Sequence, residues 1–217
     1  IHVLHISTAE EMELLRDAKD LASVEVLPNH LTLAAPECYE RLKGFAQQNP
    51  PVREQRHQDA LWRALNAGIV DVLATDHAPH TREEKERPYP ASPSGMPGVQ
   101  TMVPVMLTHV NNGKLTLQRF VELTSAGPQR VFGLADKGRI AEGYHADFTV
   151  VDLKRKETIT EEWSKSKCGW TPYDGFEATG WPVATIIRGG FVMRDGEIVK
   201  KGGGQPVRFN ETLEPMG

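Results

Sequence analysis

The stretch IVDVLATDHAPH, residues 69–80, gives the clearest indication of the fold. It opens with a short apolar run, residues 69–74, that is rich in β-branched side chains. Such a run is typical of a strand buried on both faces, as in a parallel sheet. Because Pro79 disfavours a helix immediately after the run, the polar residues that follow are expected on a loop at the carboxyl end of the strand.

Three side chains of this loop, Asp76, His77 and His80, can take part in chemistry. Asp76 offers a hard oxygen ligand or a proton acceptor, and each histidine can bind metal, transfer protons or bind an anion. In a (β/α) barrel, catalytic groups collect at the carboxyl ends of the strands. An N-capping aspartate with two surface histidines is the alternative, but the position after a buried strand favours a catalytic site.

The residues before this stretch alternate between strand and helix patterns. The expected elements are a strand at 1–6 that ends near His5, a helix after the capping box at Thr8, a strand at 24–27, a loop at 28–30, and helices at 36–42 and 54–66. Strand–helix–strand–helix–strand is the order of a parallel α/β unit. The first part of the chain is therefore expected to be α/β.

The residues after the stretch change character twice. TREEKER, residues 81–87, is expected to be a solvated charged run, and the irregular stretch 88–98 is long enough to form a lid or a pocket wall. Helices are expected at 99–110 and 117–123. From Gly138 onward the pattern alternates as in strands, and Asp195-Gly196 is a strong hairpin signal.

These patterns predict two units, a partial (β/α) barrel with its site loops at 1–136 and a small β-rich module with a tail at 137–217. A complete (β/α)8 barrel needs about 250 residues, whereas the α/β part supplies only three strand–helix units. The chain also begins inside a strand pattern without a methionine. The fold class expected is thus α/β, the C-terminal part of a (β/α)8 TIM-like barrel whose other strands come from elsewhere.

Composition narrows the function classes. The 217 residues have a formal net charge of -4 and no basic stripe, so nucleic acid is not an expected partner. No run approaches the roughly 18 apolar residues of a membrane span. The two cysteines, Cys38 and Cys168, are far apart, which argues against a disulfide framework and fits a reducing cytoplasm.

Several segments together resemble one family. They are HVLHIST (2–8), EVLPNHL (25–31), NPPVR (49–53), TDHAPH (75–80), SGMPGVQT (94–101), GRIAEGYHADFTVVD (138–152) and CGWTPYDG (168–175). In this order they resemble the C-terminal part of dihydroorotases, which are metal-dependent cyclic amidohydrolases. The segment at 138–152 is shared by the wider amidohydrolase superfamily, whereas the combination of NPPVR, DHAPH and WTPYDG is more specific to dihydroorotases.

The resemblance implies a role for each matching residue. His5 would be a metal ligand, and Asp76 would be both a metal ligand and the general base. His80, Asn49 and the backbone around Ser94 and Gly95 would hold the substrate. Imidazole and carboxylate are ligands that suit zinc, and one or two zinc ions are expected. Zinc makes its bound water acidic enough to supply hydroxide near neutral pH.

The chain departs from the family pattern at three places. Where related proteins often have two histidines after the proline, this chain has Asn29-His30, which leaves His30 as a weaker candidate ligand. Ser94 stands where several relatives have an aromatic residue. The paired histidines and the bridging ligand of the family belong to strands outside this sequence, so these residues alone do not complete a two-metal site.

Other polar residues have structural interpretations. His2 is expected to be structural, and His57 and His109 are expected on the surface. Glu25 is either a carboxylate at or beside the metal or a salt-bridge partner at the strand end. His77 is expected to support a ligand through a hydrogen bond rather than to be one.

The resemblance implies zinc-dependent, reversible interconversion of dihydroorotate and N-carbamoyl-aspartate in pyrimidine biosynthesis. An allantoinase- or hydantoinase-like enzyme is one alternative. An inactive relative that scaffolds aspartate transcarbamoylase is another, although such a protein would be expected to lose His5, Asp76 and His80. A small-molecule substrate, a cytoplasmic location and either a homodimer or association with aspartate transcarbamoylase are the expectations for partners.

Overall fold

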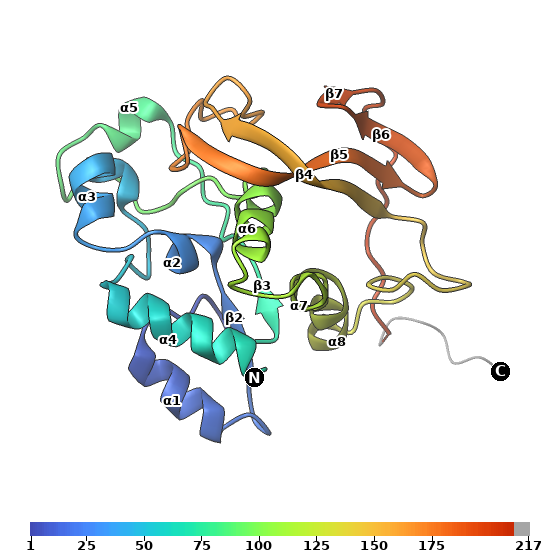
Figure 1. Cartoon of the computed structure of the whole chain (residues 1–217), viewed down its shortest axis with the longest axis horizontal. Helices are drawn as coiled ribbons and strands as arrows, with labels where there is room; N and C mark the ends of the chain where they lie inside the picture. The colour runs from blue at the N-terminus through green and yellow to red at the C-terminus, as the bar shows by residue number, and fades with distance from the viewer. Residues whose placement is uncertain (211–217) are drawn as a thin grey trace.

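Three short parallel strands form the centre of the first half of the chain in the computed structural model, which describes residues 1–210 (Figure 1). The sheet order is β1-β2-β3, with β1 at His2–Val3, β2 at Ser23–Val26 and β3 at Val72–Leu73. Both outer strands are shorter than expected. Each has a partner on one side only within residues 1–210, although backbone hydrogen bonds to β2 continue to Ile6 beyond β1 and to Ala74 beyond β3.

Two helices cover this sheet and form where the sequence predicts them. Helix α1, Ala9–Asp17, begins with the expected capping box, in which Thr8 and Glu11 satisfy each other's backbone N–H groups. Helix α4, Gln55–Asn66, buries Leu61 and Leu65. The first hydrophobic core lies between these helices, the strands and the helices that follow Gly98.

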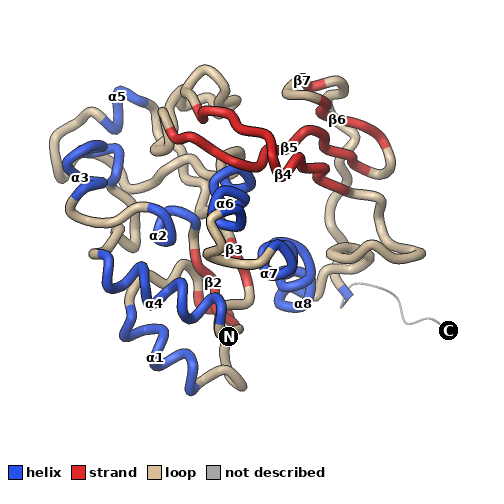
Figure 2. Tube along the Cα trace, viewed as in Figure 1, coloured by secondary structure: helices blue, strands red, loops and turns tan. Residues whose placement is uncertain are grey.

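The segment between β2 and α4 is more helical than expected. Residues 28–30 do not form a loop but lie in helix α2, Pro28–Thr32, because a proline at the first helical position costs no hydrogen bond. Helix α3, Glu37–Leu42, matches its prediction and runs into a short 3-10 turn, Lys43–Ala46. Helix α5, Arg82–Lys85, follows β3 (Figure 2).

A layer of helices separates the parallel strands from the second sheet. It consists of α6, Met102–Asn111, and α7, Leu117–Val121, which continues through a π-helical turn at Glu122–Ala126 into α8, Gly127–Phe132. The antiparallel sheet then lies across α6 (Figure 1). Its strands, in order, are β4, Phe148–Ile159, β5, Phe176–Ile187, β6, Gly190–Arg194, and β7, Glu197–Ile198.

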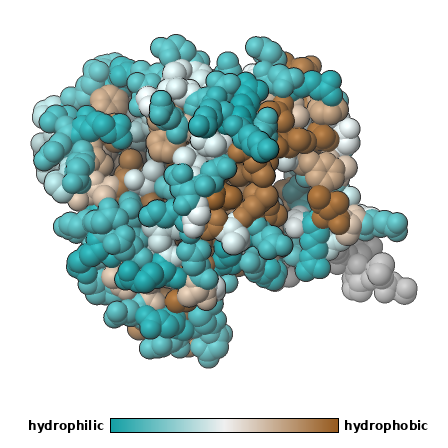
Figure 3. Space-filling view, in the orientation of Figure 1, coloured by the Kyte–Doolittle hydropathy of each residue, from teal (hydrophilic) through white to brown (hydrophobic). Residues whose placement is uncertain are grey.

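The antiparallel sheet contacts α6 closely at one glycine. Gly180 has a φ of 102°, and a Cβ there would lie 2.6 Å from the Cβ of Leu107. Thr179 N–H also donates to Thr108 Oγ1 over 2.9 Å. These contacts fix β5 on the helix, whereas the far end of the sheet leaves an open apolar groove of about 820 Å³ beside α7 (Figure 3).

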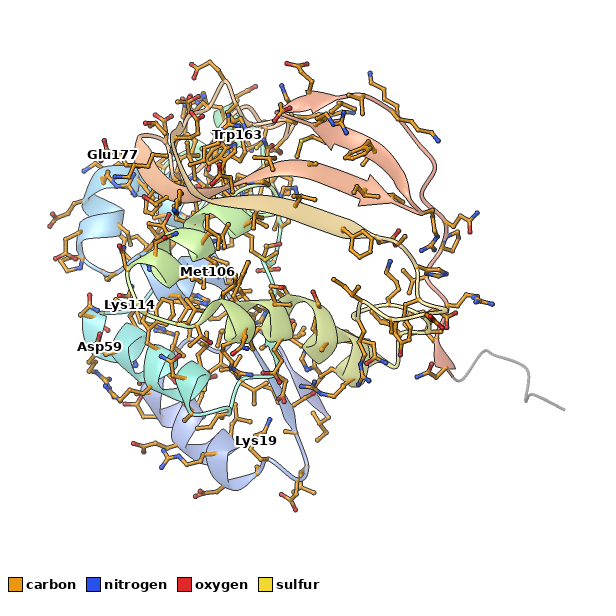
Figure 4. The ribbon with its side chains drawn as sticks, turned by 45° about the vertical axis from the view of Figure 1, so that its right-hand side comes forward. Lys19, Asp59, Met106, Lys114, Trp163 and Glu177 are labelled. Carbon is orange, nitrogen blue, oxygen red and sulfur yellow. The ribbon has the colours of Figure 1, made fainter. Side chains whose placement is uncertain are left out.

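A second hydrophobic core joins the site loops to the antiparallel sheet. It includes Met96, Ile159 and Trp170, all nearly inaccessible to solvent. The partly buried Trp163, labelled in Figure 4, packs against this core, with its ring centroid 4.7 Å from that of the buried Trp181. This core therefore contains residues from both sides of the boundary expected at 136/137, and the division into two domains stays a prediction.

Candidate active site

His5 and Asp76 both follow parallel strands at their carboxyl ends. His5 comes two residues after β1, and Asp76 three residues after β3. Both have a left-handed backbone, with φ of 36° and 45°. This conformation raises the free energy of a non-glycine residue. It persists chiefly where the surrounding structure imposes it, often at functional sites.

Glu25 fixes the backbone of His5. Its carboxylate is 6% exposed, and Oε1 accepts a hydrogen bond from the His5 N–H over 3.3 Å. Oε2 lies 3.4 Å from His2 Nε2, and His2 Nδ1 lies 2.8 Å from Ser23 Oγ. Glu25 is thus the strand-end partner of a histidine and also supports His5, while His2 has the structural role expected of it.

His30 is buried and lies near enough to the half-buried His5 and the exposed Asp76 to be affected by their charges. It is 3% exposed, and burial lowers its pKa to about 4, an effect that the positive charge of His5 increases and the negative charge of Asp76 opposes. Nε2 is 3.0 Å from the carbonyl of Pro50 and 2.7 Å from Gln48 Nε2. Its other ring nitrogen, Nδ1, is buried and has no hydrogen-bond partner among the described residues. His30 is therefore neutral near pH 7.

His77 joins the loop after β3 to the stretch 94–99. Its Nδ1 accepts hydrogen bonds from the N–H groups of Gly98 and Val99, over 3.0 and 3.4 Å. The neighbouring Ala78 N–H donates to the carbonyl of Met96 over 3.1 Å. These bonds give His77 a supporting role.

His80, Ser94 and Gly95 lie together on these joined loops. His80 Nε2 is 3.1 Å from the Ser94 carbonyl, and the His80 carbonyl accepts a hydrogen bond from Trp170 Nε1 over 2.8 Å. Gly95 has a φ of 142°, and a Cβ there would lie 2.4 Å from the carbonyl oxygen of Ala78. Only glycine allows this close approach.

Asn49 and Ser94 line an open cavity of about 1090 Å³. His5, Asp76 and His80 are not among its lining residues. The expected site residues therefore form two groups. The strand-end group comprises His5 and Asp76 with Glu25 and His30, and the loop group comprises Asn49, His80, Ser94 and Gly95. Across residues 1–210, no cluster of three or more histidine, cysteine, aspartate or glutamate side chains could hold a metal ion.

Comparison with known proteins places the chain in a family. Residues 1–199 match the family model described as the amidohydrolase family. The chain belongs to the amidohydrolase family. This is a family of metal-dependent hydrolases.

Curated proteins that are similar to this chain include several dihydroorotases. It is 42% identical to the dihydroorotase of Pyrococcus furiosus over 207 residues, which is 95% of this chain and 48% of that protein. It is 39% identical to the dihydroorotase of Bacillus subtilis over 206 residues, 92% of this chain and 47% of that protein. The chain thus spans about half the length of the curated relatives it matches.

Solved structures similar to this chain include two hydantoinases. The L-hydantoinase (dihydropyrimidinase) of Arthrobacter aurescens matches with a TM-score of 0.88 and 32% identity, over 92% of this chain and 46% of that one. The D-hydantoinase of Thermus sp. matches with a TM-score of 0.87 and 30% identity, over 94% of this chain and 47% of that one. Each match again covers about half of the hydantoinase chain.

The donor chemistry of the strand-end group fits part of a metal site in an amidohydrolase. His5 and Asp76 supply an imidazole and a carboxylate, and neither side chain makes a hydrogen bond within residues 1–210. The orphaned Nδ1 of His30 is a further nitrogen in the same neighbourhood. His5 and Asp76 are two donors, one fewer than the three protein ligands of a catalytic zinc site, and His30 would be the third.

The structure confirms most of the solvated charged run expected at 81–87, because residues 81–83, 86 and 87 are exposed, and corrects it at Lys85. Residues 82–85 form α5 behind a capping box between Thr81 and Glu84, and Lys85 is 1% exposed. The capping box was present in the sequence as a signal for a helix. The burial of Lys85 has no such signal, because its partners, the carbonyls of Gln47 and Pro93, belong to other segments of the chain.

The two histidines expected on the surface are packed. His57 is 5% exposed, and its Nδ1 accepts a hydrogen bond from the N–H of Ala9 over 3.0 Å, which joins α4 to α1. His109 is half-buried, with its ring 5.0 Å from that of Trp62 and its Nε2 2.9 Å from Thr32 Oγ1. Burial lowers the pKa of His109 to about 4. Both residues occupy interfaces between helices that the sequence pattern of a single helix does not reveal.

None of the described helices is long and apolar enough to cross a membrane.

Proposed function

We propose that this chain is the C-terminal part of a zinc-dependent cyclic amidohydrolase that interconverts dihydroorotate and N-carbamoyl-aspartate in pyrimidine biosynthesis. The observation that carries the proposal is the pair His5 and Asp76, unpaired side chains at the carboxyl ends of parallel strands. The sequence similarity to dihydroorotases supports the choice of substrate. On this proposal the remaining barrel strands and metal ligands belong to a segment outside these residues.

His5 and Asp76 would hold the metal, one or two zinc ions, with His30 as a weaker candidate. When bound, zinc would make the attacking water more acidic and polarise the amide carbonyl. Glu25 would keep the His5 main chain in place through its hydrogen bond to the His5 N–H. Because burial keeps His30 neutral near pH 7, its ring would offer the metal a nitrogen lone pair rather than a positive charge.

Asp76 would move the proton. It would accept a proton from the attacking water as the new C–O bond forms at the ring amide. It would then return this proton to the ring nitrogen as the C–N bond breaks, so that the open-chain product leaves with a neutral nitrogen. In the reverse direction the same carboxylate would first take the proton from that nitrogen.

The loop group would bind the substrate. His80 and Asn49 would contact the carboxylate and the amide of the ring, together with the backbone around Ser94 and Gly95. The hydrogen bond between His80 and the Ser94 carbonyl supports this assignment, because it places the imidazole next to the backbone that would line the substrate. The steric requirement at Gly95 supports it as well.

A hydantoinase-like activity is the second candidate, favoured by the structural similarity to hydantoinases. An inactive scaffold for aspartate transcarbamoylase is the non-enzyme candidate. The test is to measure kcat/KM of the intact zinc-loaded protein for dihydroorotate, hydantoin, dihydrouracil and allantoin. The proposal expects dihydroorotate to be preferred by at least about tenfold. A preference for another ring would select that activity, and no turnover with full zinc occupancy would support the scaffold, which co-elution with aspartate transcarbamoylase would then check.

A further inference from the structure

Lys85 is a buried cation without a carboxylate partner. Its side chain is 1% exposed, and no ion pair involves it within residues 1–210. Its Nζ instead donates to two backbone carbonyls, that of Gln47 over 2.9 Å and that of Pro93 over 2.7 Å. Burial of an ammonium is unfavourable unless its hydrogen bonds are satisfied, so these two carbonyls determine where the charge can lie.

The two carbonyls belong to different segments of the loop group. Gln47 lies two residues before Asn49, and Pro93 immediately precedes Ser94. The Gln47 carbonyl also accepts the N–H of Gly95 over 2.9 Å. One carbonyl oxygen thus receives both the Lys85 ammonium and the backbone of the second segment, which makes it the point where the two segments join.

Trp170, which lies between β4 and β5, contacts both Lys85 and the backbone of His80. Its ring centroid lies 5.8 Å from Lys85 Nζ, a cation–π distance, and its Nε1 donates to the His80 carbonyl. The same tryptophan therefore contacts the buried cation and fixes the backbone of His80. Burial lowers the pKa of Lys85 to about 8, which agrees with a cation held by dipoles and an aromatic face.

We propose that Lys85 is a positioning residue for substrate binding: its ammonium joins residues 47–49 to residues 93–95 and so sets the separation between Asn49 and the backbone at Ser94 and Gly95. The inference rests on the proposed function, because it takes these two segments as the substrate-binding loops. Both segments line the cavity of about 1090 Å³, and Lys85 lies in its wall.

A purely structural role predicts a different result from a positioning role. If Lys85 only stabilised the fold, its loss would lower the melting temperature and the folded fraction, but the folded molecules would bind substrate normally. If it positions the loops, the folded molecules would bind substrate poorly while the strand-end group, which Lys85 does not contact, continues to work. The two roles therefore separate in KM and kcat.

The test compares Lys85→Met, Lys85→Arg and a control, Lys154→Met, in the intact zinc-loaded protein. Methionine keeps nearly the length of the side chain and removes the donors. Lys154 lies in β4, is exposed, does not line the cavity, and its side chain makes no hydrogen bond within residues 1–210. We expect Lys85→Met to raise KM for dihydroorotate about tenfold or more, with kcat within about threefold and zinc content unchanged. Arginine should restore part of the loss, and Lys154→Met should match the wild type.

Hydrogen exchange gives a readout that does not depend on turnover. Peptides covering residues 44–50 and 92–96 should exchange faster in Lys85→Met. Without the ammonium, the Gln47 and Pro93 carbonyls are no longer held together, so the hydrogen bond from the Gly95 N–H to Gln47 should open more often. A KM within twofold of wild type in well-folded Lys85→Met, or unchanged exchange in both peptides, would overturn the proposal. If the methionine variant does not fold, Lys85→Gln decides. Its amide is shorter than the lysine side chain and carries no charge, so a wild-type KM with wild-type exchange would overturn the proposal equally.

Failure of this inference can be told apart from failure of the proposed function. If the wild type turns over another cyclic amide instead of dihydroorotate, the same KM comparison is made with that substrate. If it turns over none, the proposed function fails and the positioning role fails with it, whereas the exchange data still show whether Lys85 joins the two segments.

Discussion

The strand-end group and the loop group differ in how their polar side chains are used. In the strand-end group, the side chains of His5 and Asp76 make no hydrogen bonds within residues 1–210, although both backbones are left-handed. In the loop group, His80 is bonded to Ser94, and Gly95 to Gln47. The unpaired side chains of His5 and Asp76 at the strand ends are free to react, whereas the hydrogen bonds of His80 and Gly95 hold the loops that shape the site.

Within the two groups, the non-glycine residues with a positive φ, His5 and Asp76, both belong to the strand-end group. A non-glycine residue in the left-handed region costs on the order of 1–3 kcal/mol, and Glu25 supports one of the two residues that pay it. The loop group instead uses a glycine, Gly95, where its backbone has a positive φ. The comparison predicts that changes in the strand-end group lower kcat or metal affinity and that changes in the loop group alter KM and substrate preference.

The largest effect is expected from Asp76→Asn. Asparagine tolerates the left-handed backbone at this position, so the fold should be kept while the proton acceptor is lost. We expect kcat to fall by about 10²–10⁴-fold, the usual contribution of a general base, with little change in the melting temperature. Steady-state kinetics with zinc analysis of the intact protein measure this. Near wild-type kcat at normal zinc content would remove Asp76 from its assigned role.

His5→Ala should lower metal affinity. Loss of groups that merely support a ligand already costs 10–100-fold in affinity, so loss of the ligand itself should cost at least about as much. His5→Asn is the matched control for the backbone, because asparagine accepts positive φ but does not supply the imidazole. Zinc titration of both variants checks the prediction, and an unchanged zinc stoichiometry in both would make His5 a structural residue.

His80→Ala tests the substrate side of the comparison. Loss of a charge-assisted hydrogen bond to a buried carboxylate should cost roughly 1.5–3 kcal/mol, or about ten- to a hundred-fold in kcat/KM for dihydroorotate. A neutral hydantoin has no carboxylate, so its kcat/KM should fall much less. Equal losses for both compounds would assign His80 to the metal site or to the fold, and would favour the hydantoinase-like alternative.

The sequence predicted the strand-end group better than the loop group's support. His5 and Asp76 follow buried apolar runs, and a strand's end can be read from local pattern. The burial of Lys85 could not be predicted from local pattern, because it depends on Gln47, Pro93 and Trp170, which tertiary folding brings together. The same limit explains why His57 and His109 were expected on the surface: each packs against a helix distant in sequence.

The smallest effect is expected from Ser94→Ala, which separates side chain from backbone in the loop group. The Ser94 hydroxyl accepts one hydrogen bond from Gln47 Nε2 over 3.3 Å, whereas its carbonyl is the partner of His80. Alanine removes the hydroxyl and keeps the carbonyl. A single neutral hydrogen bond contributes about 0.5–1.5 kcal/mol, so KM should rise by no more than about tenfold and kcat should not change. The measurement is KM for dihydroorotate in Ser94→Ala beside His80→Ala. If the serine variant loses as much as the histidine variant, the hydroxyl itself contacts the substrate, and the loop group would then contribute reactive side chains as well as shape.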